Sequence, residues 1–426
     1  MKQIPEIETT MESVIRFASA GAKGDSVNRP PYDWGDFVKC ATEHHVLPLV
    51  ACALLNSSEI ACPDDMKEYM LDSMRNISAS NLIRRQRVLG LINDLQKANF
   101  RIQVLKGYAI AGYYAYPEVR ESVDVDLLIN PKQEKDIYSY LEGKGFKVTP
   151  RSRTSHQGVC QHSKYGVVEI HAHLYDEIVA DVWFRGINEN DYQTETPIEI
   201  VIDGCRTQTL GYTDQLIFLV LHMIKHFIGS GLTIRMILDV ALFFSHHREH
   251  IDIERFWDTM EKLRYSTLVQ CALKLVVIYG GFDPSSFRGV KDVDRGLVNQ
   301  LVEDIERGGY MGSNEMKERQ DASMEYNRRM LLRDKPYFVY FLYMLRWKLR
   351  SAWSHMFPEK MYLIKEYPYL QRWPICLPLV RICKAISYPL SKLHSGILMR
   401  QIRTESSTIS LASKERIKLF EELKII

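Results

Sequence analysis

Hydrophobic positions recur with helical spacing through the first hundred residues. Over residues 8–100, apolar side chains repeat every three or four positions, and the longest run begins at the Pro-Asp-Asp of 63–65 and ends near 98–100. Side chains at this spacing share one face of a helix, so the pattern predicts amphipathic helices. Residues 1–100 are therefore predicted to form an N-terminal helical region.

The spacing changes after residue 100. Short runs of alternating or β-branched residues predict strands, and two helical segments separate them. The strands are expected near 102–105, 123–129, 146–148 and 167–173, and the helices near 108–116 and 132–141. This mixture predicts one α/β domain over residues 101–210.

Helical spacing returns after this domain. It predicts a helical domain over residues 211–305. Residues 306–426 are again helical in pattern, but prolines interrupt them and basic residues are frequent. The predicted fold class is α+β, in which N-terminal and C-terminal helical regions flank a small mixed β-sheet.

Charge is balanced over the whole chain but not within it. The 426 residues include 55 Lys and Arg against 53 Asp and Glu, which argues against a surface built entirely for nucleic acid. Residues 331–403 nevertheless carry 13 Lys and Arg and three Asp and Glu. This basic C-terminal region could make weak contact with an anionic membrane or with nucleic acid, or could face the acidic remainder of the chain. The aromatic residues at 337–353 within it are expected to pack in a helix with a cationic outer face.

Cysteine spacing and apolar run length suggest where the protein resides. The eight cysteines are far apart, without a CxxC pair, and the polar N-terminus has no apolar signal segment. The longest apolar runs reach about half of the roughly 20 residues that a membrane span needs. A cytoplasmic protein with reduced thiols and no transmembrane helix is expected.

Two acidic residues, Asp124 and Asp126, begin a predicted strand. Side chains two positions apart share one face of a strand, so their carboxylates project together. Glu169, on a later strand, is expected to share a face with His171 and His173. If the two strands are neighbours, the three carboxylates can hold Mg²⁺ or Mn²⁺, because these ions prefer hard oxygen ligands. Zinc at the two histidines is a weaker alternative, since no further ligand has suitable spacing.

Small and basic residues precede this strand. Lys106 and Gly107 lie between a strand and a short helix, where backbone N–H groups and the ammonium attract phosphate and glycine permits close approach. Arg120 either contacts phosphate or pairs with Asp124. Taken alone, an Asp-x-Asp pair also fits a solvated strand edge, but the ordered combination favours a site.

This ordered combination resembles a known family. Its motifs are Leu-Lys-Gly at 105–107, Arg-x-Ser-x-Asp-x-Asp-Leu at 120–127 and Glu-x-His at 169–171. Together they resemble the uncharacterised bacterial nucleotidyltransferases of the polymerase-β-type superfamily. Weaker similarity extends over roughly residues 35–390.

The resemblance implies both a reaction and a site. The reaction is transfer of a nucleoside monophosphate from an NTP, with release of pyrophosphate, to an unidentified small molecule, peptide, protein or RNA. The carboxylates that bind metal and act in catalysis are those of Asp124, Asp126 and Glu169. The residues that contact the nucleotide are Lys106, Gly107, Arg120 and Ser122.

One departure from the family pattern supports a second interpretation. The usual Gly-Ser or Gly-Gly pair is replaced by Gly107-Tyr108, so a serine that would touch phosphate is missing. A non-catalytic nucleotide-binding or scaffold protein that retains the nucleotidyltransferase fold is therefore the alternative function.

Polar residues further along the chain have two interpretations. Lys225 and His226 are expected to be ordinary interior or surface residues, and the alternative is that they line the nucleotide cleft. His222 and His226 do not form a metalloprotease helix, because Met223 stands where the glutamate base would be. Arg235 and Asp239, four positions apart in a predicted helix, are expected to form a salt bridge rather than a site.

Overall fold

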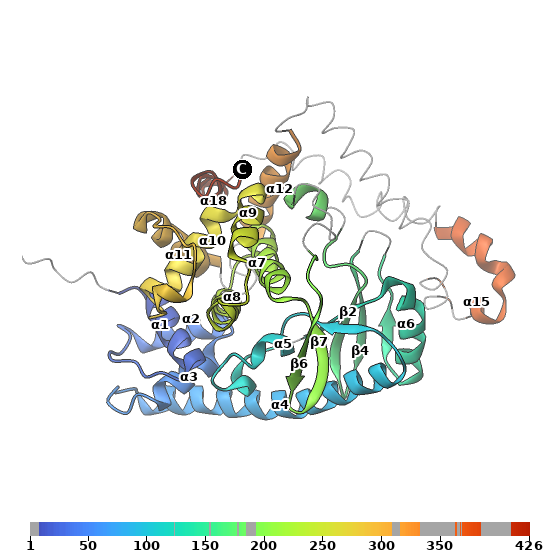
Figure 1. Cartoon of the computed structure of the whole chain (residues 1–426), viewed down its shortest axis with the longest axis horizontal. Helices are drawn as coiled ribbons and strands as arrows, with labels where there is room; N and C mark the ends of the chain where they lie inside the picture. Colours follow the sequence, from blue (N-terminus) through green and yellow to red (C-terminus); the bar gives the residue numbers. More distant parts are fainter. Residues whose placement is uncertain are drawn as a thin grey trace, which may run out of the picture.

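Two bodies, one helical and one built on a β-sheet, lie along a single long helix in the computed structural model (Figure 1). The structure describes residues 8–122, 124–152, 155–176, 179–184, 193–308, 316–332, 363, 367, 369–384 and 410–426. The aromatic stretch expected to form a helix at 337–353 lies outside these residues.

Four helices form the N-terminal region, as the apolar spacing predicted. They are α1 (Thr10–Lys23), α2 (Trp34–Glu43), α3 (Leu47–Leu55) and α4 (Asp64–Lys97). The cap of α1 is reciprocal, because Thr9 accepts from the backbone of Glu12 and donates its own backbone N–H to that side chain. At 34 residues, α4 confirms the long helix expected from residue 64.

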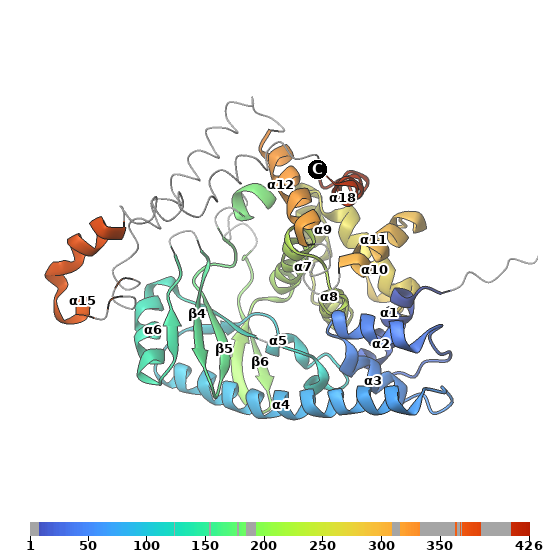
Figure 2. The ribbon, with the colours of Figure 1, turned by 180° about the vertical axis from the view of Figure 1, so that it is seen from behind.

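Helix α4 belongs to both bodies. Its first half packs against α3, and Met70 lies in the core of the helical body. Its second half lies beneath the sheet, where Val88, Leu91 and Ile92 are buried against strand residues. Figures 1 and 2 show the helix from opposite sides along the base of the molecule. The sheet and the helical body therefore share one support.

The sheet has seven strands in the order β3-β4-β5-β2-β1-β7-β6. They are β1 (Ile102–Val104), β2 (Asp124–Ile129), β3 (Lys147–Thr149), β4 (Gln157–His162), β5 (Gly166–His171), β6 (Ile198–Ile202) and β7 (Cys205–Thr209). Because β2 pairs antiparallel with β1 and parallel with β5, the sheet is mixed. The predicted α+β class is confirmed.

The two faces of the sheet differ in polarity. Val125, Val168 and Ile170 face α4 and α6 (Glu134–Gly143) and form a second, smaller core. The other face carries Asp126 and His171. Alternation along the strands thus separates an apolar face from a face with chemically active groups.

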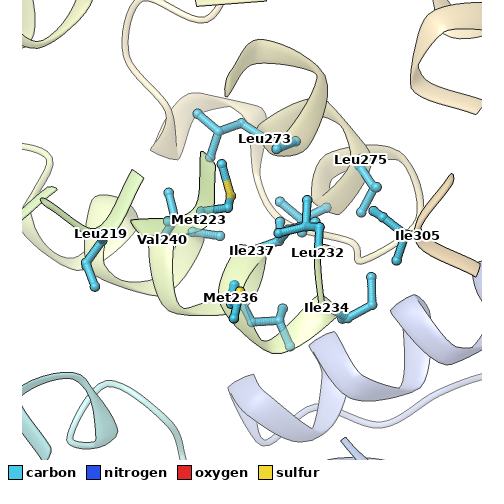
Figure 3. Packing of buried hydrophobic residues seen from close by; sticks show 14 of the residues in the cluster. Leu219, Met223, Leu232, Ile234, Met236, Ile237, Val240, Leu273, Leu275 and Ile305 are labelled. Atoms are coloured by element: carbon cyan, nitrogen blue, oxygen red, sulfur yellow. The ribbon is translucent and has the colours of Figure 1, made fainter. Parts of the chain in front are cut away.

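Helices after the sheet complete the helical body. They are α7 (Tyr212–Gly229), α8 (Ile234–His247), α9 (Ile253–Leu263), α10 (Ser266–Ile278), α11 (Arg295–Gly308), α12 (Met316–Leu332) and α18 (Leu411–Glu422). Their apolar faces and those of α1 to α3 share one hydrophobic core, and Figure 3 shows part of it. Regions far apart in the sequence thus pack as one body. Among the residues described, no helix is long and apolar enough to cross a membrane.

The shorter elements lie between these helices and strands. They are α5 (Tyr108–Ala111), α15 (Tyr369–Arg372), the 3₁₀ turns η1 (Pro117–Val119), η2 (Pro131–Gln133), η5 (Pro284–Ser286) and η7 (Pro374–Cys376), and the π-helical turn η3 (Val179–Trp183). The helix expected at 108–116 is thus only one turn long, since α5 ends at Ala111.

Candidate active site

The parallel pairing of β2 with β5 sets the position of the acidic residues. Asp126 lies directly opposite Glu169 in the register. Nε2 of His171 is 3.0 Å from Oδ1 of Asp126 and 3.6 Å from Oε2 of Glu169. One ligand atom from each of these side chains lies within 4.8 Å of the others. The two strands are therefore neighbours, as the carboxylate site requires.

Asp126 is almost completely buried, at 1% exposed. Burial would raise the pKa of its carboxyl, but Lys106 and His171 outweigh burial and hold that pKa below its usual range. Its second oxygen, Oδ2, is buried and accepts no hydrogen bond. An unsatisfied carboxylate oxygen beside a second carboxylate is a suitable ligand for a divalent cation.

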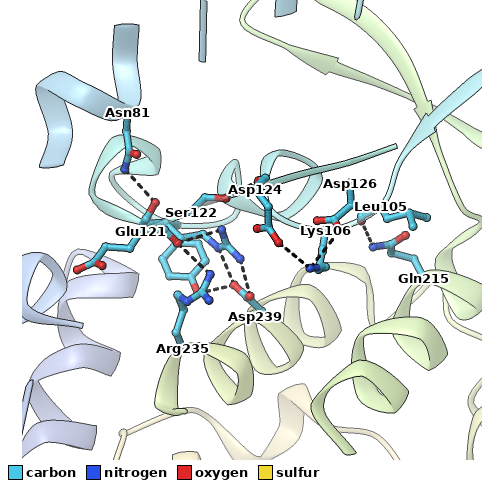
Figure 4. A network of polar contacts seen from close by, with 12 residues as sticks. Asn81, Leu105, Lys106, Glu121, Ser122, Asp124, Asp126, Gln215, Arg235 and Asp239 are labelled. Carbon is cyan, nitrogen blue, oxygen red and sulfur yellow. Dashed lines mark hydrogen bonds and ion pairs between the residues drawn. The ribbon is translucent and has the colours of Figure 1, made fainter. Parts of the chain in front are cut away.

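Lys106 lies between the two aspartates (Figure 4). Its Nζ is 3.4 Å from Oδ2 of Asp124 and 3.1 Å from Oδ1 of Asp126. Burial would lower the pKa of the ammonium, but the carboxylates outweigh it and raise that pKa to about 12. The side chain of Asp124 is 35% exposed, so this end of the cluster is open to solvent.

Gly107 and Ser122 shape the backbone beside Asp124. Gly107 has a φ of 61°, which disfavours other residues, and a Cβ there would lie 3.2 Å from Oγ of Ser122. That hydroxyl donates to the carbonyl of Asp124 at 3.1 Å. Both residues thus hold the loop from which the first carboxylate projects.

Arg120 has a different partner from the one expected. Its Nε and Nη2 donate to the two carboxylate oxygens of Asp239 at 2.8 and 2.6 Å. The hydroxyl of Tyr114 donates to the same carboxylate at 2.7 Å. Arg235 instead donates to the carbonyl of Glu121, so the expected salt bridge within α8 is wrong. The sequence could not show this, because Arg120 and Asp239 are 119 residues apart.

Between the sheet and helices α7 and α8 lies a cavity of about 380 Å³. Asp124, Glu169 and His171 line one wall, and His222, Lys225 and His226 of α7 line the other with Arg235 of α8. The buried Asp126 is not among the lining residues. Lys225 and His226 thus line a cavity, which agrees with the alternative interpretation rather than the expected one, and His222 lines it as well. That a nucleotide binds there stays a prediction. The remaining lining residues, which the sequence analysis did not single out, are His156, Gln157, Val167, Leu174, Tyr175, Phe218, Leu219 and Met236.

Lys225 and Arg235 are two cations of this wall for which no ion pair with a described carboxylate is found, and Lys225 is the one without a hydrogen bond. Burial lowers the pKa of its ammonium. Within the part of the chain that the structure describes, no ion pair or hydrogen bond holds it. The charge of Asp176 offsets only part of this effect of burial on the pKa. An ammonium that is partly buried without a direct ion pair is costly, and an anionic ligand would reduce that cost.

Comparison with known families shows a match over more than half of the chain. The model of a family described as uncharacterised nucleotidyltransferases matches residues 30–281, which include the whole sheet and helices α7 to α9. The chain belongs to this family. Both walls of the cavity therefore lie within the nucleotidyltransferase match.

The comparisons with curated proteins and with solved structures give no further assignment. No curated protein matches the chain. Among solved structures, an antigenic nucleotidyltransferase-like protein from Paracoccidioides brasiliensis is similar over 45% of this chain and 93% of its own, at 17% identity and a TM-score of 0.29. A similarity of this extent carries no argument about the fold or the function.

His173 departs from the predicted strand pattern. Strand β5 ends at His171, and bends follow over residues 172–175. His173 is exposed and does not join the cluster of Asp126, Glu169 and His171. The strand that was expected to align it with Glu169 therefore ends two residues before His173.

Proposed function

We propose that this nucleotidyltransferase transfers a nucleoside monophosphate from an NTP to an acceptor hydroxyl or amine, releases pyrophosphate and requires Mg²⁺ or Mn²⁺. The acceptor would be a small molecule, a peptide, a protein or an RNA end. The proposal places the enzyme in the polymerase-β type. The observation that carries it is the pairing of Asp126 with Glu169 on neighbouring strands, with Glu169 and Asp124 lining a cavity that Lys225 and Arg235 line from the helices.

The residues present fit a hard divalent cation. Asp126 and Glu169 would hold it with Asp124, because all three offer carboxylate oxygens and Oδ2 of Asp126 lacks a partner. Asp124 is not part of the group within 4.8 Å, in which the third member is His171. When bound, such a cation supplies charge neutralisation and polarisation of the transferred phosphoryl group.

The chain's own cations would position the triphosphate. Lys106 lines the cavity beside the carboxylates, and Lys225 lines it from α7. Since phosphoryl transfer depends mainly on positioning and charge neutralisation, cations on two sides of the triphosphate favour one orientation. Lys106 also places a positive charge near the position where the family serine is missing.

The test is release of pyrophosphate from each labelled NTP in the presence of Mg²⁺ and candidate acceptors. We expect release with at least one NTP and its loss on addition of a chelator. Binding of NTP without release under all conditions would instead support the second candidate function.

That candidate is a non-catalytic nucleotide-binding or scaffold protein. One observation favours it: the ammonium of Lys106 already lies between two of the carboxylates and neutralises them without an ion. Retention of NTP at the Lys225 wall is compatible with this function, whereas turnover is not.

Lys225→Met is expected to raise the KM for NTP about tenfold or more, with a smaller effect on kcat. A charge-assisted hydrogen bond contributes about 1.5–3 kcal/mol, which corresponds to this change in affinity. Steady-state pyrophosphate release against NTP concentration measures it. Lys262→Met, at an exposed position of α9, is the matched control and should leave KM unchanged. An unaltered KM in Lys225→Met would contradict the triphosphate role.

A further inference from the structure

Apolar side chains are concentrated on the surface of residues 369–384. This segment comprises α15, η7 and a helical stretch at 377–384, and it lies at the outer edge of the molecule in both views (Figures 1 and 2). It holds five of the 15 large exposed hydrophobic residues of the described chain. They are Tyr369 (49% exposed), Trp373 (60%), Ile375 (83%), Leu379 (64%) and Ile382 (54%). Isolated exposed residues are ordinary, but this density on 16 residues is not.

The exposed residues form one stripe, and the other side of the segment is packed. Leu379 and Ile382 lie three positions apart on the helical stretch 377–384, the spacing of one helical side, and Ile375 lies in η7 directly before that stretch. Leu370 and Val380 are buried in a small cluster of their own. The segment thus resolves into a packed side and an exposed apolar side.

Charge on the segment has a single sign. Arg372, Arg381 and Lys384 lie within it, and the printed sequence has no Asp or Glu from 367 to 404. Cations beside exposed aromatic and aliphatic residues are typical of elements that lie at the surface of an anionic bilayer. A second copy of the chain fits less well, because self-pairing would bring like charges together.

Nucleic acid is also a weaker fit for the stripe. Single-stranded nucleic acid binds by stacking on aromatic rings. Only Tyr369 and Trp373 are aromatic, and the other three large exposed hydrophobic residues of the segment are aliphatic.

We propose that residues 369–384 bind the surface of an anionic lipid bilayer. Trp373, Ile375 and Leu379 enter the boundary between headgroups and acyl chains, and the exposed Arg372 lies among the anionic headgroups. The segment lies on the membrane and does not cross it.

Co-sedimentation of the full chain with vesicles tests this surface. We expect binding to vesicles of phosphatidylcholine mixed with phosphatidylglycerol, little binding to phosphatidylcholine alone, and weaker binding as salt is added. The variant Ile375→Ser/Leu379→Ser should bind the anionic vesicles about tenfold or more weakly, since two apolar side chains no longer leave water. Leu411→Ser, which alters a 74% exposed leucine on α18, should bind as the unaltered chain does.

Tryptophan fluorescence tests whether Trp373 enters the boundary between headgroups and acyl chains. Brominated lipids should quench tryptophan emission in the unaltered chain, and Trp373→Phe should remove most of that quenching. Circular dichroism checks that each variant is folded, which the exposure of the substituted side chains favours.

Three outcomes would overturn the inference: equal vesicle binding by the double variant and the unaltered chain, binding to oligonucleotides but not to vesicles, or self-association that the double variant abolishes without any vesicle binding. None of these measurements uses NTP. Failure here and failure of the proposed enzymatic function are therefore distinguishable.

Discussion

Asp124→Asn is expected to reduce NTP turnover about 100-fold or more, because groups that stabilise transition-state charge contribute on this scale. The substitution removes one negative charge from the cluster and leaves its shape nearly unchanged. The half-exposed side chain contributes little to folding, so the melting temperature should hardly change. Pyrophosphate release over a range of Mg²⁺ concentrations, together with a thermal melt, measures both effects.

The control for this experiment is Asp292→Asn. That carboxylate is 90% exposed and pairs with Lys274 on the surface, away from the cavity lining. It should leave turnover and Mg²⁺ dependence unaltered. If Asp124→Asn retained full activity with the same Mg²⁺ dependence, the assignment of the carboxylate site would be wrong.

Arg120→Met should lower the free energy of unfolding by about 3–5 kcal/mol, because it leaves the buried carboxylate of Asp239 without its counter-ion. Both side chains of this pair are nearly inaccessible, so solvent cannot replace the lost guanidinium. Urea unfolding measures the change. Adding Asp239→Asn to the variant should recover a large part of it, since a neutral amide costs less to bury than a carboxylate.

Arg206→Met is the matched comparison for the buried pair. Its guanidinium is 77% exposed and pairs with Glu199 at 3.4 Å, so its loss should cost less than about 1 kcal/mol. If Arg120→Met were equally mild and instead raised the KM for NTP, Arg120 would be a phosphate ligand rather than a structural cation.

Local patterns predicted the elements that carry the acidic residues. The Asp124 and Asp126 pair and the run around Glu169 each have strand character, and only their mutual register had to be supplied by the fold. Strand β4 escaped prediction because its sequence mixes polar and small residues. The β6–β7 hairpin had a usable signal in the sequence, because the dipeptide Asp203-Gly204 stands between two alternating segments. Both residues adopt the positive φ that such a turn requires.

Contacts between residues far apart in the sequence could not be predicted from local patterns. The partner of Arg120 is supplied by α8, and no local spacing connects the two. The same holds for Lys225, whose place opposite the carboxylates depends on how α7 packs over the sheet. Periodicity identifies the buried face of such a helix, but it does not identify what lies across a cavity from the other side chains.

The continuous course of α4 has a mechanical consequence for the cavity. At 1.5 Å per residue, its 34 residues form a rod about 50 Å long that carries the strands at one end and the helical body at the other. The sheet and the helical body, which form the two walls of the cavity, are thus both attached to one stiff helix. A large movement of the two walls away from each other would require α4 to bend. Entry and exit of ligands should therefore depend on side chains and loops at the rim of the cavity.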